Sequence, residues 1–325
     1  DGTGPNSFEA LLSGPCWEDP ADAPALLSGH RPGPDDITQL IYTSGTTGEP
    51  KGVMHSANTV MANIVPYAER LHLFQGDVVL MASPMAHQTG FMYGLMMPIM
   101  LRASAVLQDV WDPKMAVQLI REHGCSFTMA STPFLTDLAR TVADTGQDVA
   151  SLRTFLCAGA PIPGPLVEQA RKAMGTKIVS AWGMTENGAV TLINLDDDDK
   201  LAFTTDGCPL PGVELKVVEV DGSPMPVGEP GKLLVRACSN FGGYLKRPQW
   251  NGTDADGWFD TGDLARVDAN GYVRITGRSK DVIIRGGENI PVIEIEALLY
   301  KHPAVAQVAI VAYPDERLGE RACAI

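Results

Sequence analysis

The most informative stretch of the sequence is a loop rich in glycine and hydroxyl side chains, Ile41-Tyr42-Thr43-Ser44-Gly45-Thr46-Thr47-Gly48-Glu49-Pro50-Lys51-Gly52. It follows a candidate strand at Thr38–Thr43. Glycines let backbone N–H groups approach an anion closely, the hydroxyl groups add donors, and Lys51 adds a positive charge. It is not a Walker A loop, because two residues separate Gly48 from Lys51 and Gly52 stands where that motif has Ser or Thr. We therefore predict a phosphate site; the alternative is a polar strand-to-helix turn with an incidental lysine.

Short apolar stretches alternate with amphipathic helical patterns over residues 36–205. This alternation predicts an α/β fold with a mainly parallel, βα-layered sheet. The expected strands are Val78–Ala82, Phe127–Ala130, Thr154–Cys157 and Ile178–Ala181. The expected helices run from Ala57 towards Leu73, after a Ser56 cap and with an interruption or kink at Pro66, from Asp112 to Gly124, and from Thr132 to Gly146.

The pattern changes after about residue 205. Over residues 206–279, β-rich stretches separated by Asp-Gly and Asn-Gly turns predict a small antiparallel sheet or barrel, with strands at Val213–Val220, Lys232–Ala237 and Tyr272–Thr276. Residues 280–325 predict an incomplete C-terminal domain, with a strand at Val282–Ile284, a helix from Pro291 and a strand at Val305–Ala312. Residues 1–35 are rich in Gly, Pro and Asp and predict a surface segment or a truncation tail.

Charge and composition exclude several classes of protein. The chain has 325 residues, is 45% hydrophobic and carries a net charge of −14 (25 − 39), which argues against a disordered chain and against a nucleic-acid partner. Its six cysteines form no CxxC pair, which excludes a zinc ribbon and predicts scattered buried thiols in a reducing compartment, the cytoplasm. The most apolar stretch, Gly90–Leu101, has 12 residues and is too short to span a membrane.

The glycine-rich loop resembles the phosphate-binding signature of the AMP-forming adenylating enzymes, which include acyl-CoA synthetases, peptide-synthetase adenylation domains and firefly luciferase. Four further motifs follow in the order of that family. They resemble its adenine-site turn (157–161, CAGAP), its aromatic-Gly-x-Thr-Glu motif (181–186, AWGMTE), its ribose motif (258–263, WFDTGD) and its hinge motif (277–281, GRSKD). The resemblance covers the chain from about residue 38 to the end.

This resemblance implies a nucleotide site for ATP. Its residues would be Thr43, Ser44, Gly45, Thr46, Thr47, Gly48, Lys51, Gly159, Ala160, Pro161, Trp182, Gly183, Met184, Thr185, Asp263 and Arg278. The Trp182 ring can stack on adenine, Thr185 can donate to the α-phosphate, and Glu186 with Thr43 can hold Mg²⁺. Asp263 would accept hydrogen bonds from the ribose hydroxyls. A surface carboxylate for Glu186, a simple turn for Asp263 and a structural ion pair for Arg278 are the alternatives.

The acyl group of the substrate would lie near His87, in the segment 84–87 that takes the place of the family's acyl-pocket motif. His87 can donate to the developing acyl phosphate, so we count it with Lys51, Thr185 and Glu186 as catalytic. Phe91, Met92 and Trp182 would line the substrate pocket and favour an apolar acid; core packing is the alternative for His87 and the Met-rich stretch.

The segment 283–291, IIRGGENIP, resembles the acyl-CoA synthetase version of the region after the hinge. Gly286 and Gly287 would let the thin pantetheine arm of coenzyme A pass close to the backbone, whereas a tight turn before Pro291 is the alternative. The hinge itself is expected at Lys280. Only 45 residues follow it (325 − 280), and none forms the Pro/Gly-Lys motif that carries the terminal lysine of the family. We therefore expect a chain truncated at both ends.

Together these motifs predict an acyl-CoA synthetase that uses ATP, Mg²⁺ and coenzyme A. Its substrate would be a small carboxylic acid, and the sequence most resembles synthetases for alicyclic or medium-chain acids such as cyclohexanecarboxylate. Two alternatives stay open: acyl transfer to the phosphopantetheine of a carrier protein, and a non-catalytic remnant that binds nucleotide without turnover. A homodimer is compatible with each of these interpretations.

Overall fold

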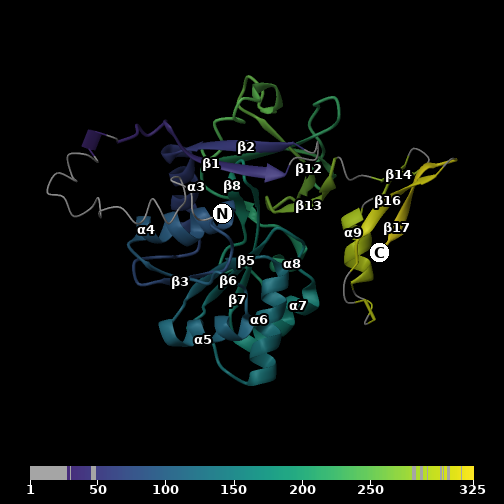
Figure 1. Cartoon of the computed structure of the whole chain (residues 1–325). Helices are drawn as coiled ribbons and strands as arrows, with labels where there is room; N and C mark the ends of the chain where they lie inside the picture. The colour runs from purple at the N-terminus through teal and green to yellow at the C-terminus, as the bar shows by residue number, and fades with distance from the viewer. Residues whose placement is uncertain are drawn as a thin grey trace, which may run out of the picture.

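The computed structural model describes residues 28–29, 31–44, 49–279, 283–285, 288–290, 292–300, 302, 304–305, 308–315 and 317–325. Figure 1 shows helices α5, α6 and α7 grouped beside the strands of a large sheet, with a smaller sheet containing β12 and β13 at one end. The last part of the chain forms a separate α+β unit, and its helix α9 approaches β13.

The large sheet confirms the predicted α/β fold. Its seven strands have the order β4-β3-β5-β6-β7-β8-β9, and the pairs from β4 to β7 are all parallel. The strand β8 runs antiparallel to β7 because only three residues link the two strands, too few for a parallel crossover. The strands are β3 (Val78–Met81), β4 (Ser104–Leu107), β5 (Phe127–Ala130), β6 (Thr154–Ala158), β7 (Lys177–Met184), β8 (Gly188–Leu192) and β9 (Cys208–Pro209).

The predicted N-cap residues of two helices are present in the structure. Ser56 forms a reciprocal capping box with Thr59 at the start of α3, and Asp112 accepts two backbone hydrogen bonds at the start of α5. Pro66 lies inside α3, which continues through it as one helix and ends earlier than predicted. The helices are α3 (Ala57–Arg70), the π-helix η1 (Gly90–Met96), α4 (Met97–Leu101), α5 (Pro113–His123), α6 (Thr132–Thr145), α7 (Gly164–Met174) and α8 (Leu201–Thr204).

The glycine-rich loop connects two antiparallel strands, β1 (Ile37–Ser44) and β2 (Pro50–Ser56). The sequence predicts the first strand and misses the second, since Pro50 and Gly52 are poor strand formers. The loop is therefore a hairpin connection and not a turn from a strand into a helix. Alternate residues of β1 face inward, because Gln39 and Ile41 are buried whereas Leu40 and Tyr42 are exposed.

The smaller sheet has the antiparallel order β10-β11-β12-β13, as predicted, and forms an open sheet. Its apolar face packs on the large sheet, because Leu233, Val235, Ala265 and Val273 share one buried cluster with Trp182 and Val190. Residues 259–263 of the ribose motif lie in β12, a strand that was not predicted from the sequence. The strands are β10 (Val213–Val218), β11 (Gly231–Ala237), β12 (Phe259–Val267) and β13 (Val273–Arg278), with the short 3-10 helix η2 (Pro248–Trp250) before β12.

The final unit is a four-stranded sheet of order β15-β14-β17-β16 with one helix. The strand expected at Val305–Ala312 begins later, at Ile310. The elements are β14 (Ile283–Arg285), β15 (Glu288–Ile290), α9 (Val292–Leu299), β16 (Ile310–Asp315) and β17 (Gly319–Ala324).

The cysteines of the described residues are all free, but the prediction that they are buried is only partly correct. Cys125 and Cys157 are buried, and burial raises the pKa of these thiols to about 11 and about 12. Cys238 and Cys323 are exposed instead. Within the described ranges, no helix combines the length and the apolar character that a membrane span requires.

Candidate functional site

Three of the predicted motifs follow parallel strands of the large sheet. The segment 84–87 comes after β3, the turn 159–161 comes after β6, and Thr185 and Glu186 come directly after β7. Since the carboxyl ends of parallel strands meet at one edge of a sheet, the fold brings the acyl, adenine and Thr-Glu motifs to the same edge. This edge is where open α/β sheets bind their ligands.

Thr43 and Lys51 form a directly opposed pair across the β1–β2 hairpin, next to the loop. Their side chains lie on the same inward face as Ile41 and Val53, which are buried. The hairpin therefore presents one hydroxyl and one ammonium group together at the start and end of the loop. The loop residues Gly45, Thr46, Thr47 and Gly48, and the side chain of Ser44, lie outside the described residues.

Glu186 is a buried carboxylate with an exposed fraction of 6%. Its Oε1 accepts a hydrogen bond of 2.6 Å from the Tyr244 hydroxyl. Burial and the neighbouring carboxylate raise the pKa of Tyr244 far above its usual value, so the hydroxyl keeps its proton and acts as the donor. The ion pairs among the described residues include none with Glu186.

A buried carboxylate without a cationic partner is costly, because a charge is stable inside a protein when it is paired or coordinates a metal. Magnesium prefers such oxygen ligands and is usually bound by one or two carboxylates together with phosphate groups. Glu186, with its second oxygen unused by the Tyr244 bond, therefore fits a Mg²⁺ ligand.

Lys51 lies against two aromatic rings. Its Nζ is 4.9 Å from the centroid of the Tyr244 ring and 5.5 Å from that of Trp250, which are cation–π distances. Tyr244 thus touches both the loop lysine and Glu186. The role of Tyr244 cannot be predicted from the sequence, because nothing in the local pattern relates it to a carboxylate 58 positions away.

His55 is a second residue that sequence reasoning did not identify. It is buried on β2, where its Nε2 lies 2.8 Å from the carbonyl oxygen of Thr185 and its Nδ1 lies 2.9 Å from Thr59 Oγ1. Burial lowers the pKa of His55, which favours a neutral ring whose Nε2–H donates to the Thr185 carbonyl. This bond ties the hairpin to the Thr-Glu motif.

Trp182, Asp263 and Arg278 form one network between the two sheets. The Trp182 indole N–H donates to Asp263 Oδ2 at 2.9 Å, and Arg278 Nε lies 3.3 Å from Asp263 Oδ1. Trp182 and Asp263 are both buried, whereas the Arg278 side chain is 63% exposed. The ion pair foreseen as the alternative role of Arg278 is therefore present, and it joins two residues of the predicted nucleotide site.

The predicted acyl-pocket residues differ in exposure. His87 is exposed, and its Nδ1 accepts a 3.2 Å hydrogen bond from the Thr89 backbone. Phe91 is half-buried, whereas Met92 packs in the main core. Both lie in the π-helix, a type of turn that is frequent at functional sites. Of the other predicted residues, Lys280, Gly286 and Gly287 lie outside the described residues.

Gly183 has a structural role that its place in the motif does not reveal. A Cβ at this position would lie 1.9 Å from the Gly188 carbonyl oxygen, across the β7–β8 pair. We expect Gly183→Ala to lower the free energy of unfolding by roughly 3 kcal/mol, as strong overpacking does. Urea denaturation measures this change. Gly277→Ala is the control, since a Cβ there meets nothing within 4 Å, and equal stability of the two variants would contradict the prediction.

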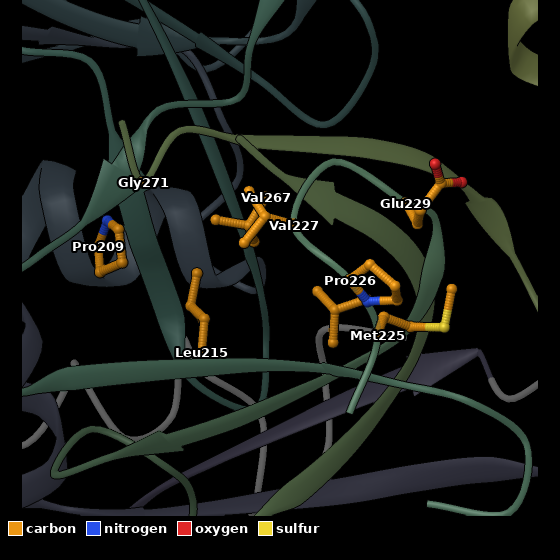
Figure 2. Close-up of a pocket in the computed structure, with 9 residues that line it drawn as sticks. Pro209, Leu215, Met225, Pro226, Val227, Glu229, Val267 and Gly271 are labelled. Atoms are coloured by element: carbon orange, nitrogen blue, oxygen red, sulfur yellow. The ribbon is translucent and has the colours of Figure 1, made fainter. Parts of the chain in front are cut away.

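A separate concavity of about 250 Å³ lies on the smaller sheet, where apolar side chains and Glu229 surround it (Figure 2). Its lining residues are Pro209, Leu215, Val217, Met225, Pro226, Val227, Glu229, Val267 and Gly271. None of them belongs to the predicted nucleotide or acyl set. The candidate site therefore lies with the motif residues and not in this pocket.

Curated relatives match most of the chain. A medium-chain fatty-acid–CoA ligase of Escherichia coli is 38% identical over 306 residues, which cover 94% of this chain and 54% of the relative. A putative acyl-CoA synthetase of Bacillus subtilis is 36% identical over 297 residues, covering 89% of this chain and 54% of the relative. The chain thus spans about half the length of these relatives.

Solved structures share both the fold and the sequence pattern. ATP-bound MatB from Rhodopseudomonas palustris matches with a TM-score of 0.83 and 30% identity, over 90% of this chain and 58% of that one. The O-succinylbenzoate coenzyme A synthetase of Bacillus subtilis, in complex with ATP and magnesium ion, matches with a TM-score of 0.81 and 30% identity, over 90% and 60%.

The family models agree with this likeness. The model of the AMP-binding enzyme C-terminal domain matches residues 294–325, which form much of the final unit. The AMP-binding enzyme model matches residues 8–245, a range that contains the hairpin, the large sheet, Glu186 and Tyr244. Because this match covers most of the chain and includes the edge where the motifs meet, the chain belongs to the AMP-binding enzyme family.

Proposed function

We propose that this protein is an AMP-forming acyl-CoA synthetase, which joins a small carboxylic acid to coenzyme A at the expense of ATP. The observation that carries the proposal is that Lys51 and the buried Glu186 both contact Tyr244, Lys51 through the ring and Glu186 through the hydroxyl. A cationic loop for phosphates next to a carboxylate for their metal is the minimum that ATP chemistry requires. The names of the relatives, which are CoA ligases, support the same reaction.

The reaction has two displacements. A carboxylate oxygen of the acid attacks the α-phosphorus of ATP, and the bond to pyrophosphate breaks, which gives acyl-AMP. The sulfur of coenzyme A then attacks the acyl carbon, AMP leaves with the electron pair of the broken C–O bond, and the thiol proton passes to solvent. No side chain needs to form a covalent bond, so catalysis consists of positioning and charge stabilisation.

Each part of the site then has a role. The loop 43–48 and Lys51 bind the phosphates, and Thr185 donates to the α-phosphate. Glu186 and Thr43 would hold Mg²⁺, which neutralises phosphate charge when bound. The turn 159–161 and Trp182 would bind adenine, Asp263 would accept from the ribose hydroxyls, and Arg278 would assist it.

The proposal also assigns residues to the carboxylic acid and to coenzyme A, the acyl acceptor. His87 and Phe91 would contact the acyl group, and the apolar ring of Phe91 supports a medium-chain or alicyclic acid. Met92 is 1% exposed in the main core, which favours the core-packing alternative for this residue. Residues 36–205 would carry the nucleotide and acyl sites, and residues 206–279 would supply Asp263. The unit after Lys280 would rotate between the two half-reactions and would bind coenzyme A at Gly286 and Gly287. We place this function in the cytoplasm.

Pyrophosphate exchange tests the first half-reaction. With a panel of carboxylic acids, exchange that depends on the acid supports adenylation, whereas ATP binding without exchange would leave only a nucleotide-binding remnant. Thioester formation with free coenzyme A, compared with a phosphopantetheinylated carrier protein, tests the acceptor. A preference for the carrier protein would overturn the acyl-CoA synthetase assignment.

Lys51→Ala should weaken ATP binding by about 1.5–3 kcal/mol, or roughly tenfold to a hundredfold in Kd, because a charge-assisted phosphate contact is lost. Isothermal titration calorimetry measures the change. Lys172→Ala is the matched control, since this lysine is exposed on α7 and belongs to none of the motifs. An unchanged ATP affinity in a folded Lys51→Ala protein would contradict the phosphate assignment.

A further inference from the structure

The segment Phe241–Leu245 lies between β2 and the Thr-Glu motif and forms backbone hydrogen bonds with both. On one side, the amide of Gly242 donates to Met54 O at 2.8 Å, that of Met54 donates to Gly243 O at 3.1 Å, and that of Leu245 donates to Gly52 O at 2.8 Å. On the other side, the amide of Phe241 donates to Glu186 O at 2.8 Å. The backbone of this segment is thus bonded to both halves of the site.

Tyr244 is held firmly within this segment. It is 6% exposed and belongs to a small buried cluster with Val53, Phe241 and Phe259. Its backbone N–H donates to Asn251 Oδ1 at 2.9 Å. The side chain therefore has a fixed position, with its ring face towards Lys51 and its hydroxyl on Glu186.

We propose that Tyr244 is a positioning residue that holds Lys51 and Glu186 in register, and so couples binding of the phosphates to binding of their metal ion. The inference rests on the proposed function, because it gives Lys51 and Glu186 the roles assigned there. It adds a residue from outside the five motifs that carried the sequence prediction.

The two contacts have separable consequences. The hydroxyl orients the Glu186 carboxylate and satisfies Oε1, which leaves Oε2 for a cation; an O–H···O⁻ bond of 2.6 Å is a strong, charge-assisted one. The ring supports the Lys51 ammonium by a cation–π contact before any phosphate is bound. Losing the hydroxyl should therefore affect the metal requirement, whereas losing the ring should also affect phosphate binding without metal.

The test is ATP binding by this chain, measured by calorimetry over a range of Mg²⁺ concentrations. For Tyr244→Phe we expect the Mg²⁺ concentration at half-maximal ATP binding to rise several-fold, while ATP affinity without Mg²⁺ stays at the wild-type value. For Tyr244→Leu we expect the required Mg²⁺ concentration to rise and the ATP affinity without Mg²⁺ to fall. Thermal unfolding of each variant verifies that it is folded at the temperature of the titration.

A double-variant cycle distinguishes positioning from general destabilisation. If Tyr244 acts through Glu186, then Tyr244→Phe combined with Glu186→Gln should require no more Mg²⁺ than Glu186→Gln alone. Tyr272→Phe is the matched control, because the Tyr272 hydroxyl also donates to a carboxylate, Asp197 Oδ2 at 2.8 Å. This control should leave the Mg²⁺ titration unchanged.

The outcomes separate the two proposals. If the wild-type chain binds Mg²⁺–ATP and Tyr244→Phe gives a superimposable Mg²⁺ titration, the positioning role is wrong and the proposed function stands. Additive effects in the double variant would likewise overturn the positioning role. If the wild-type chain does not bind ATP with or without Mg²⁺, the proposed function is wrong and this inference falls with it.

Discussion

Replacing Glu186 by glutamine is expected to slow acyl-adenylate formation by about a hundredfold at low Mg²⁺, the scale on which one preorganised electrostatic group acts. The glutamine side chain would have nearly the same shape and could still accept from Tyr244, so the loss is that of one negative charge at the proposed metal ligand. Added Mg²⁺ should recover part of the rate, because a weaker metal site fills at higher concentration.

Pyrophosphate exchange, measured across a Mg²⁺ titration, reports this effect. Glu168→Gln is the control, since it makes the same charge change on the exposed surface of α7. The wild type and the control should reach half of their maximal rate at the same Mg²⁺ concentration. A Glu186→Gln titration that superimposes on both would mean that Glu186 is a structural carboxylate.

The comparison of Glu186 with Tyr244 shows what a sequence can predict about this site. Glu186 follows a strand within a short motif, so its position at the sheet edge can be inferred from local pattern and the geometry of parallel strands. Tyr244 reaches the same carboxylate from a distant segment, and that contact depends on how the segment packs on β2. Long-range packing of this kind leaves no periodic signal.

The hairpin gives the same lesson at the level of the fold. The loop and the first strand can be predicted from the sequence, but β2 cannot, because Pro50 and Gly52 are poor strand formers. The position of β2 is fixed by hydrogen bonds to β1 and to residues 242–245. Because β2 was not foreseen, neither was the direct pairing of Thr43 with Lys51 or the bond from His55 to Thr185. The motifs indicate which residue types the candidate site contains, and tertiary packing supplies their geometry.

Asp263→Asn should weaken the binding of AMP and ATP by the same factor, roughly tenfold to a hundredfold, since the lost contacts would be those to the ribose. In the structure, Asp263 accepts from the Trp182 indole and faces Arg278, both of which are donors. An asparagine offers only one acceptor oxygen, and its NH₂ group would have to face one of these donors. The variant should therefore hold both the ribose and Trp182 less well.

Calorimetry with AMP and with ATP tests this prediction, and Asp256→Asn, an exposed change in the preceding turn, is the control. The ratio of the AMP affinity to the ATP affinity is the informative quantity. Lys51→Ala should lower the ATP affinity more than the AMP affinity, and Glu186→Gln should mainly raise the Mg²⁺ requirement of ATP binding. Asp263→Asn should lower both affinities equally, because the nucleoside is common to both ligands. An AMP affinity equal to that of wild type, in a variant that is folded at the assay temperature, would mean that Asp263 serves only the ion pair with Arg278 and the bond to Trp182. In that case the network between the two sheets would be a structural connection, and the ribose would have to be bound by other residues.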